Sequence, residues 1–351
     1  MKKFIKIYLL VIIFLILLLQ FKVVNATEPN NNVPINPETI EVTEYSVTLK
    51  KIDGYEYSND DGRNWQNSNI FSFLEPMSTY SFIQRIKETE NYEYSQNSQA
   101  LDVKTKTLNS MPVNRIPDGY IAINNIEDLQ SVKNNLSGKY ILMNDIICDV
   151  NMDTFEPIGN TDNPFNGVFN GNNYSIVGIK QQNNTNLGLF GYNSGIIANL
   201  NVINSNFQIS ENGEIIRTVG NIAGVNSGEI LGCSSKNQIV IDKGTVLGGK
   251  KSFKQNSSWY GDEIHIGGII GINYGKVYFC NFDGLIDITT QEQYSNIGGI
   301  AGYNTDTISY CYNLADVVSN NGFSSSVGGI CGNNTSYIWY TYNLGSISNI
   351  N

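Results

Sequence analysis

The sequence predicts an all-β protein, with a small β-sandwich followed by a right-handed parallel β-solenoid, and three observations support this prediction. The chain has 351 residues, of which 41% are hydrophobic and only 15% are charged; about 25% charged residues is usual in soluble domains. Asn, Gly, Ser, Thr and Tyr must therefore supply the polar surface, and Asn and Gly favour turns. The other two observations are turn-rich β-runs before residue 107 and repeats of roughly 30 residues after it.

The first 26 residues have the pattern of a secretory signal peptide. Lys2, Lys3 and Lys6 precede an apolar run over residues 7–19, and Ala26 closes a small-residue cleavage site. The run is shorter than the roughly 20 residues that a membrane-spanning helix needs. We expect cleavage after Ala26 and a secreted or cell-surface location; the alternative is an uncleaved N-terminal anchor.

The charge of the chain excludes some partners. The formal net charge is −10, and it becomes −14 without residues 1–26 (18 basic minus 32 acidic residues). Such an acidic chain has no general attraction to nucleic acid or to anionic membranes, and no second apolar segment is long enough to span a membrane. Five cysteines without paired spacing predict neither a disulfide framework nor a zinc site. We expect no cofactor and no bound metal.

Residues 37–107, between linkers at 27–36 and 108–117, form the predicted sandwich. Residues 55–66 contain a turn signal at Asn59–Gly62 with aromatic residues on both sides, and Tyr80 follows Pro76 as in a tyrosine corner, where a Tyr hydroxyl bonds to nearby backbone. This run resembles the fibronectin-III-like modules of bacterial surface proteins. The resemblance implies a spacer, and the alternative is a module that binds glycans through Trp65.

Residues 118–351 contain five aligned repeats. An Asn follows two residues after the first Gly of each repeat, and a Cys lies nine residues after it in three of them. Because equivalent residues stack in a solenoid, we expect an inward column of Cys233, Cys280 and Cys311 and a ladder of Asn side chains. The first glycines are Gly191, Gly224, Gly271, Gly302 and Gly332, and the ladder asparagines are Asn193, Asn226, Asn273, Asn304 and Asn334.

The stretch Ile297–Asn304 and its equivalents resemble the GLUG motif of bacterial surface proteins. Tyr140–Ile146, Pro157–Gly159 and Phe165–Gly171, after a short helix opened by Asp128, resemble the block that begins many such solenoids. We expect the strand-helix-strand stretch of residues 119–146 to be the N-terminal cap. The family also includes metallopeptidases of the IgA-protease type. That activity requires a His-Glu-x-x-His helix to hold zinc, and His265 is the one histidine of the chain. We therefore predict no catalytic residues.

A second enzyme class is considered because β-helices include polysaccharide lyases and hydrolases. Such enzymes need two close carboxylates or a base beside calcium. The acids Asp283, Asp287, Asp306 and Asp316 fall at different repeat positions, and the run Asp149–Asp153 lacks the later ligands of a calcium loop. The alternative of a polysaccharide-active enzyme therefore rests only on the analogy with other β-helix folds.

Two features predict recognition instead. Phe279, Tyr310 and Tyr340 share the position before the Cys column, and Tyr312 and Tyr342 share the position after it; stacked rings there either bind a ligand or hold coils together. An insertion within residues 242–263 carries the remaining candidate ligand-binding residues, which are Lys250, Lys251, Trp259 and Tyr260. Insertions in solenoids become surface loops.

The sequence therefore predicts a non-enzymatic exported surface protein, adhesin-like or ligand-binding, whose partners are cell-wall glycans, host glycans or surface proteins. The alternatives are a secreted polysaccharide-active β-helix enzyme and a structural stalk or fragment of a larger surface protein.

Overall fold

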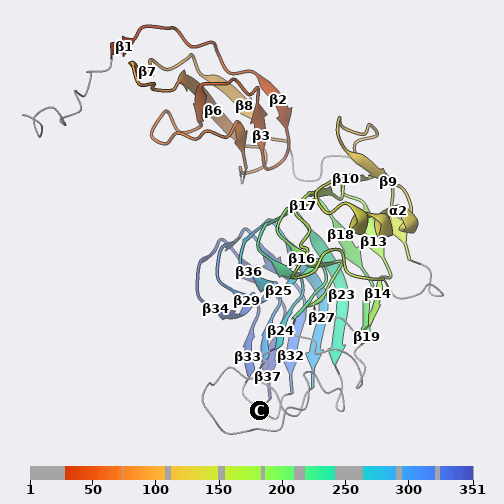
Figure 1. The fold of residues 1–351 in the computed structure, drawn as a ribbon. Coiled ribbons are helices and arrows are strands. Elements are labelled where there is room, and N and C mark those ends of the chain that lie inside the picture. The colour runs from red at the N-terminus through yellow and green to blue at the C-terminus, as the bar shows by residue number, and fades with distance from the viewer. Residues whose placement is uncertain are drawn as a thin grey trace, which may run out of the picture. The chain divides into compact units, whose positions relative to one another are not determined.

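The computed structural model describes residues 28–72, 74–106, 112–148, 155–182, 186–208, 218–241, 264–289, 295–320 and 325–350. The chain divides into two compact units, the first ending at Leu108 and the second beginning at Asn109. Nearly all regular structure is β-strand, and Figure 1 shows the strands of the second unit stacked in sequence order from green to blue. The predicted signal peptide lies outside the described residues.

The first unit is a small β-sandwich of two antiparallel three-stranded sheets, with strand orders β2-β3-β5 and β4-β6-β8. Alternating residues of both sheets form one apolar core that includes Leu49, Tyr57 and Phe82. The strands are β2 (Thr39–Val42), β3 (Val47–Leu49), β4 (Tyr55–Ser58), β5 (Ile70–Phe71), β6 (Thr79–Ile86) and β8 (Leu101–Lys104), and β1 (Glu28–Asn30) pairs in parallel with β7 (Tyr92–Ser95).

The predicted tyrosine corner is present in this unit. The backbone N–H of Glu75 donates a hydrogen bond of 2.7 Å to the hydroxyl oxygen of Tyr80. The bond ties the start of β6 to the segment before it, as in the sandwiches that use this device. Membership among fibronectin-III modules stays a prediction.

The second unit begins with a strand-helix-strand segment, as expected for residues 119–146. The side chain of Asn125 caps helix α2 (Ile126–Ser131) by accepting from the N–H of Asp128 at 2.8 Å, and this satisfies one free donor of the first turn. Leu129 of α2 is fully buried against the solenoid core. The neighbouring elements are β9 (Ile121–Ile123), the 3-10 helix η1 (Val132–Asn134), β10 (Lys139–Leu142) and β11 (Ile146–Ile147).

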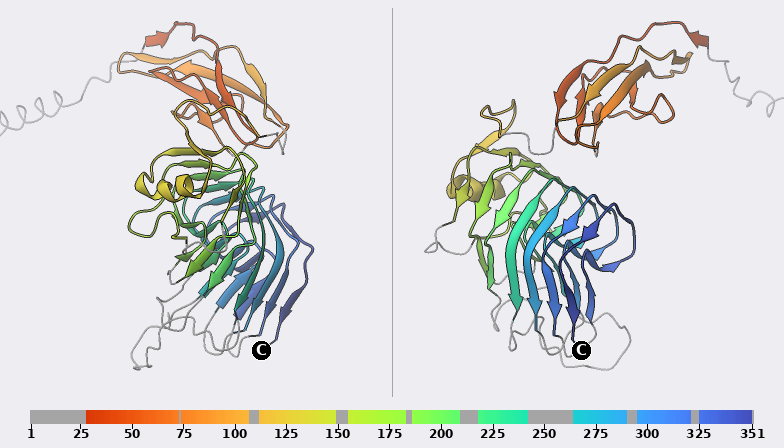
Figure 2. Two further views of the ribbon diagram at one scale, coloured as in Figure 1. Left: turned by 90° about the vertical axis from the view of Figure 1, so that its right-hand side faces the viewer. Right: turned by 180° about the vertical axis from the view of Figure 1, so that it is seen from behind.

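The rest of this unit is a parallel β-solenoid, which confirms the predicted fold class. Every strand pair in it is parallel and in register with the next coil, and Figure 2 shows the aligned strands from two further sides. One face is an eight-stranded sheet in the order β35-β30-β26-β22-β17-β12-β10-β9. Its further strands are β12 (Val168–Asn170), β17 (Ile196–Ala198), β22 (Glu229–Leu231), β26 (Lys276–Tyr278), β30 (Ile308–Ser309) and β35 (Ile338–Trp339).

A nine-stranded sheet forms the second face, and two five-stranded sheets complete the coils. The nine-stranded sheet contains β11, β13 (Ser175–Val177), β18 (Asn201–Ile203), β23 (Ser234–Ile241), β27 (Asn281–Ile288), β31 (Tyr312–Asn313), β32 (Asp316–Ser319), β36 (Tyr342–Asn343) and β37 (Ile347–Asn349). One five-stranded sheet contains β15 (Asn186–Leu187), β20 (Thr218–Gly220), β24 (Ile264–Gly267), β28 (Ser295–Gly298) and β33 (Ser325–Gly328), and the other contains β16 (Phe190–Asn193), β21 (Ala223–Asn226), β25 (Ile270–Asn273), β29 (Ala301–Asn304) and β34 (Cys331–Asn334). A short pair joins β14 (Lys180–Gln182) to β19 (Asn206–Gln208).

The predicted Asn ladder runs through all five repeats. Each side-chain amide donates to the side-chain oxygen of the next Asn, from Asn193 to Asn334, at 2.7 to 2.8 Å. Each amide also donates to the carbonyl two residues further along its own turn, as Asn273 does to Gly275 at 2.6 Å. The ladder satisfies buried polar groups that would otherwise destabilise the turn, and it fixes the register of the coils.

The glycines of the repeat mark places where no Cβ fits. A Cβ on Gly302 of β29 would lie 2.5 Å from the backbone nitrogen of Ile266 in β24 of the preceding coil, and one on Gly271 would lie 2.7 Å from Cβ of Thr218. The two five-stranded sheets therefore approach each other across the first Gly of each repeat. The paired glycines have the same cause, since a Cβ on Gly268 would collide with the ring of Phe282.

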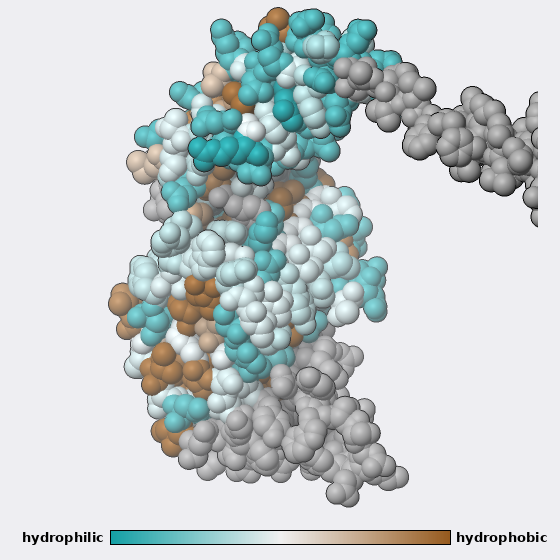
Figure 3. Space-filling model, turned by 90° about the vertical axis from the view of Figure 1, so that its left-hand side faces the viewer, coloured by the Kyte–Doolittle hydropathy of each residue, from teal (hydrophilic) through white to brown (hydrophobic). Residues whose placement is uncertain are grey.

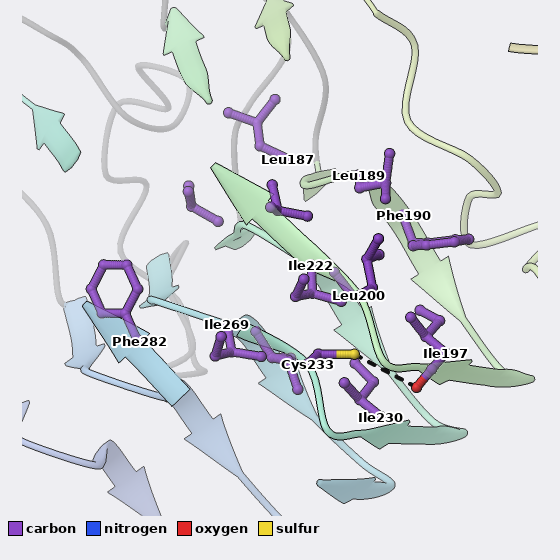
Figure 4. Packing of buried hydrophobic residues seen from close by; sticks show 14 of the residues in the cluster. Leu187, Leu189, Phe190, Ile197, Leu200, Ile222, Ile230, Cys233, Ile269 and Phe282 are labelled. Atoms are coloured by element: carbon purple, nitrogen blue, oxygen red, sulfur yellow. Dashed lines mark hydrogen bonds between the residues drawn. The ribbon is translucent and has the colours of Figure 1, made fainter. Parts of the chain in front are cut away.

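The predicted cysteine column lies in the solenoid core. Cys233, Cys280 and Cys311 are fully buried, and the N–H of Cys280 donates to Sγ of Cys311 at 3.4 Å. Figure 4 shows the surrounding packing, with the thiol of Cys233 directed at the carbonyl of Ile197 at 3.8 Å. The thiols act as small apolar groups, and burial raises the pKa of Cys280 far above its usual value.

Candidate functional site

The turn between the eight-stranded and nine-stranded sheets has a left-handed backbone conformation in successive coils. Its central residues have φ angles from 50° to 62°, and the first five donate a backbone hydrogen bond to the following coil; they are Asn173, Asn199, Gly232, Phe279, Tyr310 and Tyr340. Asn and Gly tolerate this conformation, whereas it is a rare and strained one for a bulky residue. The last three coils therefore place aromatic side chains where the backbone disfavours them.

These three rings form a stacked column. The ring centroids of Phe279 and Tyr310 are 5.0 Å apart with an interplanar angle of 13°, and Tyr310 and Tyr340 repeat the same geometry. Beside them, Tyr312 and Tyr342 stack at 5.2 Å and 4°. We call these five residues the aromatic corner. The structure thus places four of the five tyrosines that the sequence proposed as candidate ligand-binding residues in two stacked columns.

The aromatic corner is partly open to solvent, since Phe279, Tyr310 and Tyr312 are half-buried and the two rings of the last coil are exposed. Tyr340 is 73% exposed and Tyr342 is 51% exposed. Burial, followed by the neighbouring Tyr342, raises the pKa of Tyr312, so the Tyr312 phenol stays protonated at neutral pH. Because the ring faces inside each column cover one another, the corner presents ring edges and hydroxyl groups.

An acidic group lies on the eight-stranded sheet, one coil from Tyr278, whose ring centroid is 6.4 Å from that of Phe279. Glu229 of β22 pairs in register with Lys276 of β26, and its Oε2 is buried without a hydrogen-bond partner among the described residues. Burial raises the pKa of Glu229, and Lys276 opposes that shift. Burial raises the pKa of Tyr278, and the negative charges of Asp306 and Glu229 raise it further. Sequence reasoning missed Glu229, because its burial depends on the adjacent coils.

His265 does not have the setting of a catalytic base. Its ring lies 5.4 Å from the ring of Tyr303, and Nδ1 is 3.1 Å from the side-chain amide of Asn296. Burial lowers the pKa of His265 from 6.5 to about 4. The imidazole is therefore neutral at physiological pH, as expected for a strand residue.

Trp65 of the sandwich is engaged within its own unit. The guanidinium carbon of Arg85 lies 4.1 Å from the ring centroid of Trp65 and 4.0 Å from that of Tyr94. Arg85 also forms an ion pair of 2.6 Å with Glu56. A face of Trp65 is thus occupied by a cation–π contact, which favours a structural role over glycan binding.

The remaining predicted residues cannot be placed. Lys250, Lys251, Trp259 and Tyr260, with the rest of the insertion at 242–263, lie outside the described residues, as does the run Asp149–Asp153. In the described part of the chain, no group of three or more His, Cys, Asp or Glu side chains is arranged to hold a metal ion.

Comparison with protein families gives a match to the repeat. Residues 293–318 match the model of the GLUG motif. The chain contains the GLUG motif. The match covers Ile297–Asn304, where the sequence resemblance was found, together with β30, β31 and the corner residue Tyr310. Proteins with this motif are typically extracellular or surface proteins.

Comparison with other proteins adds little. One solved structure, titled a "putative immunoglobulin A1 protease from Bacteroides ovatus", is 17% identical, with a TM-score of 0.46 over 65% of this chain and 73% of that one. Similarity at this level supports no conclusion about activity. No curated protein matches the chain. Among the helices that the structure describes, none is long and apolar enough to cross a membrane.

Proposed function

We propose that this chain is a non-enzymatic, exported surface protein that recognises an uncharged glycan through the aromatic corner. The observation behind this proposal is the change of side chains at one turn, from Asn and Gly in the first coils to Phe and Tyr in the last three. The same backbone conformation is kept throughout. The changed side chains lie in a surface turn, half-buried at Phe279 and Tyr310 and exposed at Tyr340, and residues that bind ligands often lie in such connecting segments.

The energetics of the turn support this proposal. A left-handed conformation costs about 1–2 kcal/mol for a residue with a side chain, which is roughly 3–6 kcal/mol for Phe279, Tyr310 and Tyr340 together. Stacked aromatic pairs return about 0.5–1.5 kcal/mol each, or roughly 1–3 kcal/mol for the two contacts. The ring–ring term alone falls short of the strain, and the apolar area that the stacked rings bury must be added to it. Residues held in strained conformations gather at functional sites.

The chemistry of the exposed groups favours a neutral, hydroxyl-rich ligand. The corner offers phenol hydroxyls, which both donate and accept hydrogen bonds, next to ring edges. The hydroxyls repeat at the coil spacing, so they would follow a linear polymer lying along the solenoid. A surface protein that contacts the same tyrosines is the alternative partner.

The decisive experiment replaces the three strained rings by the residue that the first coils use. We expect residues 27–351 to bind saturably to an array of neutral glycans or to purified peptidoglycan, and F279N/Y310N/Y340N to lose that binding while keeping its melting temperature. Tyr92→Asn, which changes an exposed tyrosine of the sandwich, is the matched control. A variant lacking residues 242–263 separates the contribution of the insertion. Absence of binding by the unchanged protein would refute the proposal.

A polysaccharide-active enzyme is kept as a second candidate because of Glu229. A partly buried carboxyl with a raised pKa is suited to general acid catalysis, and Glu229 lies one coil from Lys276 and Tyr278. If this candidate holds, the protein shortens or cleaves one of the bound glycans and Glu229→Gln abolishes cleavage without affecting binding. Binding without release of reducing ends or unsaturated products would rule it out.

A further inference from the structure

Tyrosine rings of two neighbouring coils lie face to face at two places in the aromatic corner. Tyr312 and Tyr342 pair in register between β31 and β36, and their rings stack with centroids 5.2 Å apart at an interplanar angle of 4°. Tyr310 and Tyr340 stack at 5.0 Å and 13° beside them. We call these the two tyrosine pairs. Phe279 of the preceding coil stacks on Tyr310 in the same way but has no hydroxyl group.

The backbone holds each pair together independently of the rings. The N–H of Tyr342 donates to the carbonyl of Cys311 at 3.2 Å, and the N–H of Tyr310 donates to the carbonyl of Trp339 at 3.1 Å. These hydrogen bonds join adjacent coils, which keeps the backbones of a pair at the strand spacing of about 4.8 Å. The two phenols of a pair therefore stay in contact for as long as the coils are folded.

Two phenols in this arrangement are suited to oxidative coupling. A phenol that loses one electron and one proton becomes a phenoxyl radical, whose unpaired electron is shared with the ring carbons ortho to the oxygen. Two such radicals couple through a bond between ortho carbons, and this bond forms perpendicular to the ring planes. Stacked rings already face each other in that direction. Contact held by the fold also replaces a rare encounter between two separate radicals.

We propose that the two tyrosine pairs are sites of oxidative modification, at which a peroxide and a haem peroxidase join Tyr312 to Tyr342 and Tyr310 to Tyr340 as dityrosine. In each pair the two phenols lose two electrons and two protons, and one hydrogen peroxide takes them up and becomes two water molecules. Two ortho C–H bonds are thereby replaced by one C–C bond. The ortho protons move to the oxygens after coupling, so both rings are phenols again. Phe279 cannot form a phenoxyl radical, so coupling stops at Tyr310.

The tyrosine pairs can be reached from the side of the solenoid. Tyr310 and Tyr312 are half-buried although their coil has a neighbouring coil before and after it, so they meet solvent laterally. Figure 3 views the molecule from the side on which β36 lies in Figure 1, and much of the solenoid surface there has the pale colours of intermediate hydropathy. Peroxide carries no charge and approaches such a surface freely. The modification needs an oxidising compartment, and in this respect it rests on the proposed export.

The cross-links would fasten two successive coils to each other. Residues 312 and 342 belong to adjacent coils, so a covalent bond between them closes a loop in the unfolded chain, as a disulfide does. The described cysteines are all free thiols, and three of them lie in the core column. Dityrosine would therefore supply a covalent constraint that the cysteines do not.

Peroxidase treatment of the mature chain tests this proposal. Residues 27–351 are treated with hydrogen peroxide and a haem peroxidase, and the denatured monomer is isolated by size-exclusion chromatography. We expect dityrosine fluorescence in the monomer and a loss of two hydrogen atoms for each cross-link by mass spectrometry. Tyr310→Phe and Tyr312→Phe should each remove one cross-link, and Y310F/Y312F should remove both. Phenylalanine keeps the ring and the stacking, so these variants are expected to fold. The control is Y92F/Y94F, which changes two exposed tyrosines of the sandwich and should keep both cross-links.

Three results would overturn the proposal. They are a monomer without dityrosine, dityrosine found only in covalent dimers, and an unchanged yield in the monomer of Y310F/Y312F. The coupling is measured on purified protein, so it does not depend on export or on a glycan. Glycan binding of the untreated chain is measured separately. A chain that forms both cross-links but binds no glycan would support the modification and refute the glycan site.

Discussion

The first coils and the last three coils have the same backbone conformation at the sheet-to-sheet turn, but they carry different side chains there. At the sheet-to-sheet turn, Asn173, Asn199 and Gly232 have the same left-handed conformation as Phe279, Tyr310 and Tyr340. Inside the coils, by contrast, an Asn occupies the ladder position in all five repeats. The comparison teaches that the buried ladder specifies the fold, whereas the exposed turn is free to vary and to acquire a binding function.

The largest effect is expected where the ladder is buried. Asn273→Ala removes the donor to Asn304 and the acceptor for Asn226. The amide of Asn226 then keeps only its bond to the carbonyl of Gly228, and the side-chain oxygen of Asn304 loses its ladder donor in the core. We expect the free energy of unfolding to fall by about 3–5 kcal/mol. Asn334→Ala, at the exposed end of the same ladder, should cost about 1 kcal/mol or less. Urea denaturation of both variants measures the difference, and equal losses would show that the ladder has no interior role.

A pH effect of similar size is expected at His265. Its pKa is lowered to about 4 in the folded state, so between pH 6.5 and 4 the unfolded chain binds the proton more readily. Stability from this group is therefore complete above pH 6.5 and is lost as the pH falls towards 4, by about 3 kcal/mol. His265→Asn introduces the residue found at position 296 of the next coil and should flatten this part of the profile. An identical profile for the variant would contradict the assignment.

A smaller effect is expected in the cysteine column. Cys280→Ala leaves a gap between Cys233 and Cys311 and should lower the free energy of unfolding by about 1 kcal/mol. Thr341→Cys extends the column into the partly exposed last coil and should change stability by less than that. Thermal unfolding under reducing conditions compares the two. If Thr341→Cys lowered the free energy of unfolding more than Cys280→Ala, the last coil would pack more tightly than its exposure indicates.

The smallest effect is expected at the turn itself. Tyr310→Asn relieves about 1–2 kcal/mol of backbone strain and removes two ring contacts worth about 0.5–1.5 kcal/mol each, so the net change in stability should stay within about 1 kcal/mol. Differential scanning calorimetry is sensitive enough to check this. A loss of several kcal/mol would make the rings structural and would count against the glycan site.

Sequence reasoning succeeded where one residue type recurs at a fixed repeat position. Cys280 and Asn273 could be assigned to inward columns because equivalent positions must stack in a solenoid. It could not find the strain at Tyr310, since a φ angle leaves no trace in the residue type of an aromatic. Nor could it find the burial of Glu229 or the sheet contact at Gly302, because both depend on side chains and backbone of neighbouring coils.

The Asn ladder also bears on how such a chain changes length over generations. Each interior Asn accepts a hydrogen bond from the coil before it and donates one to the coil after it, so the two sides of every interior coil are complementary. A duplication or loss of one whole repeat reconnects the ladder without disturbing any other contact along it, whereas a partial repeat breaks it. Genes for solenoids of this type should therefore gain and lose whole coils. In each new coil, the residue at the sheet-to-sheet turn can then be replaced without affecting the ladder.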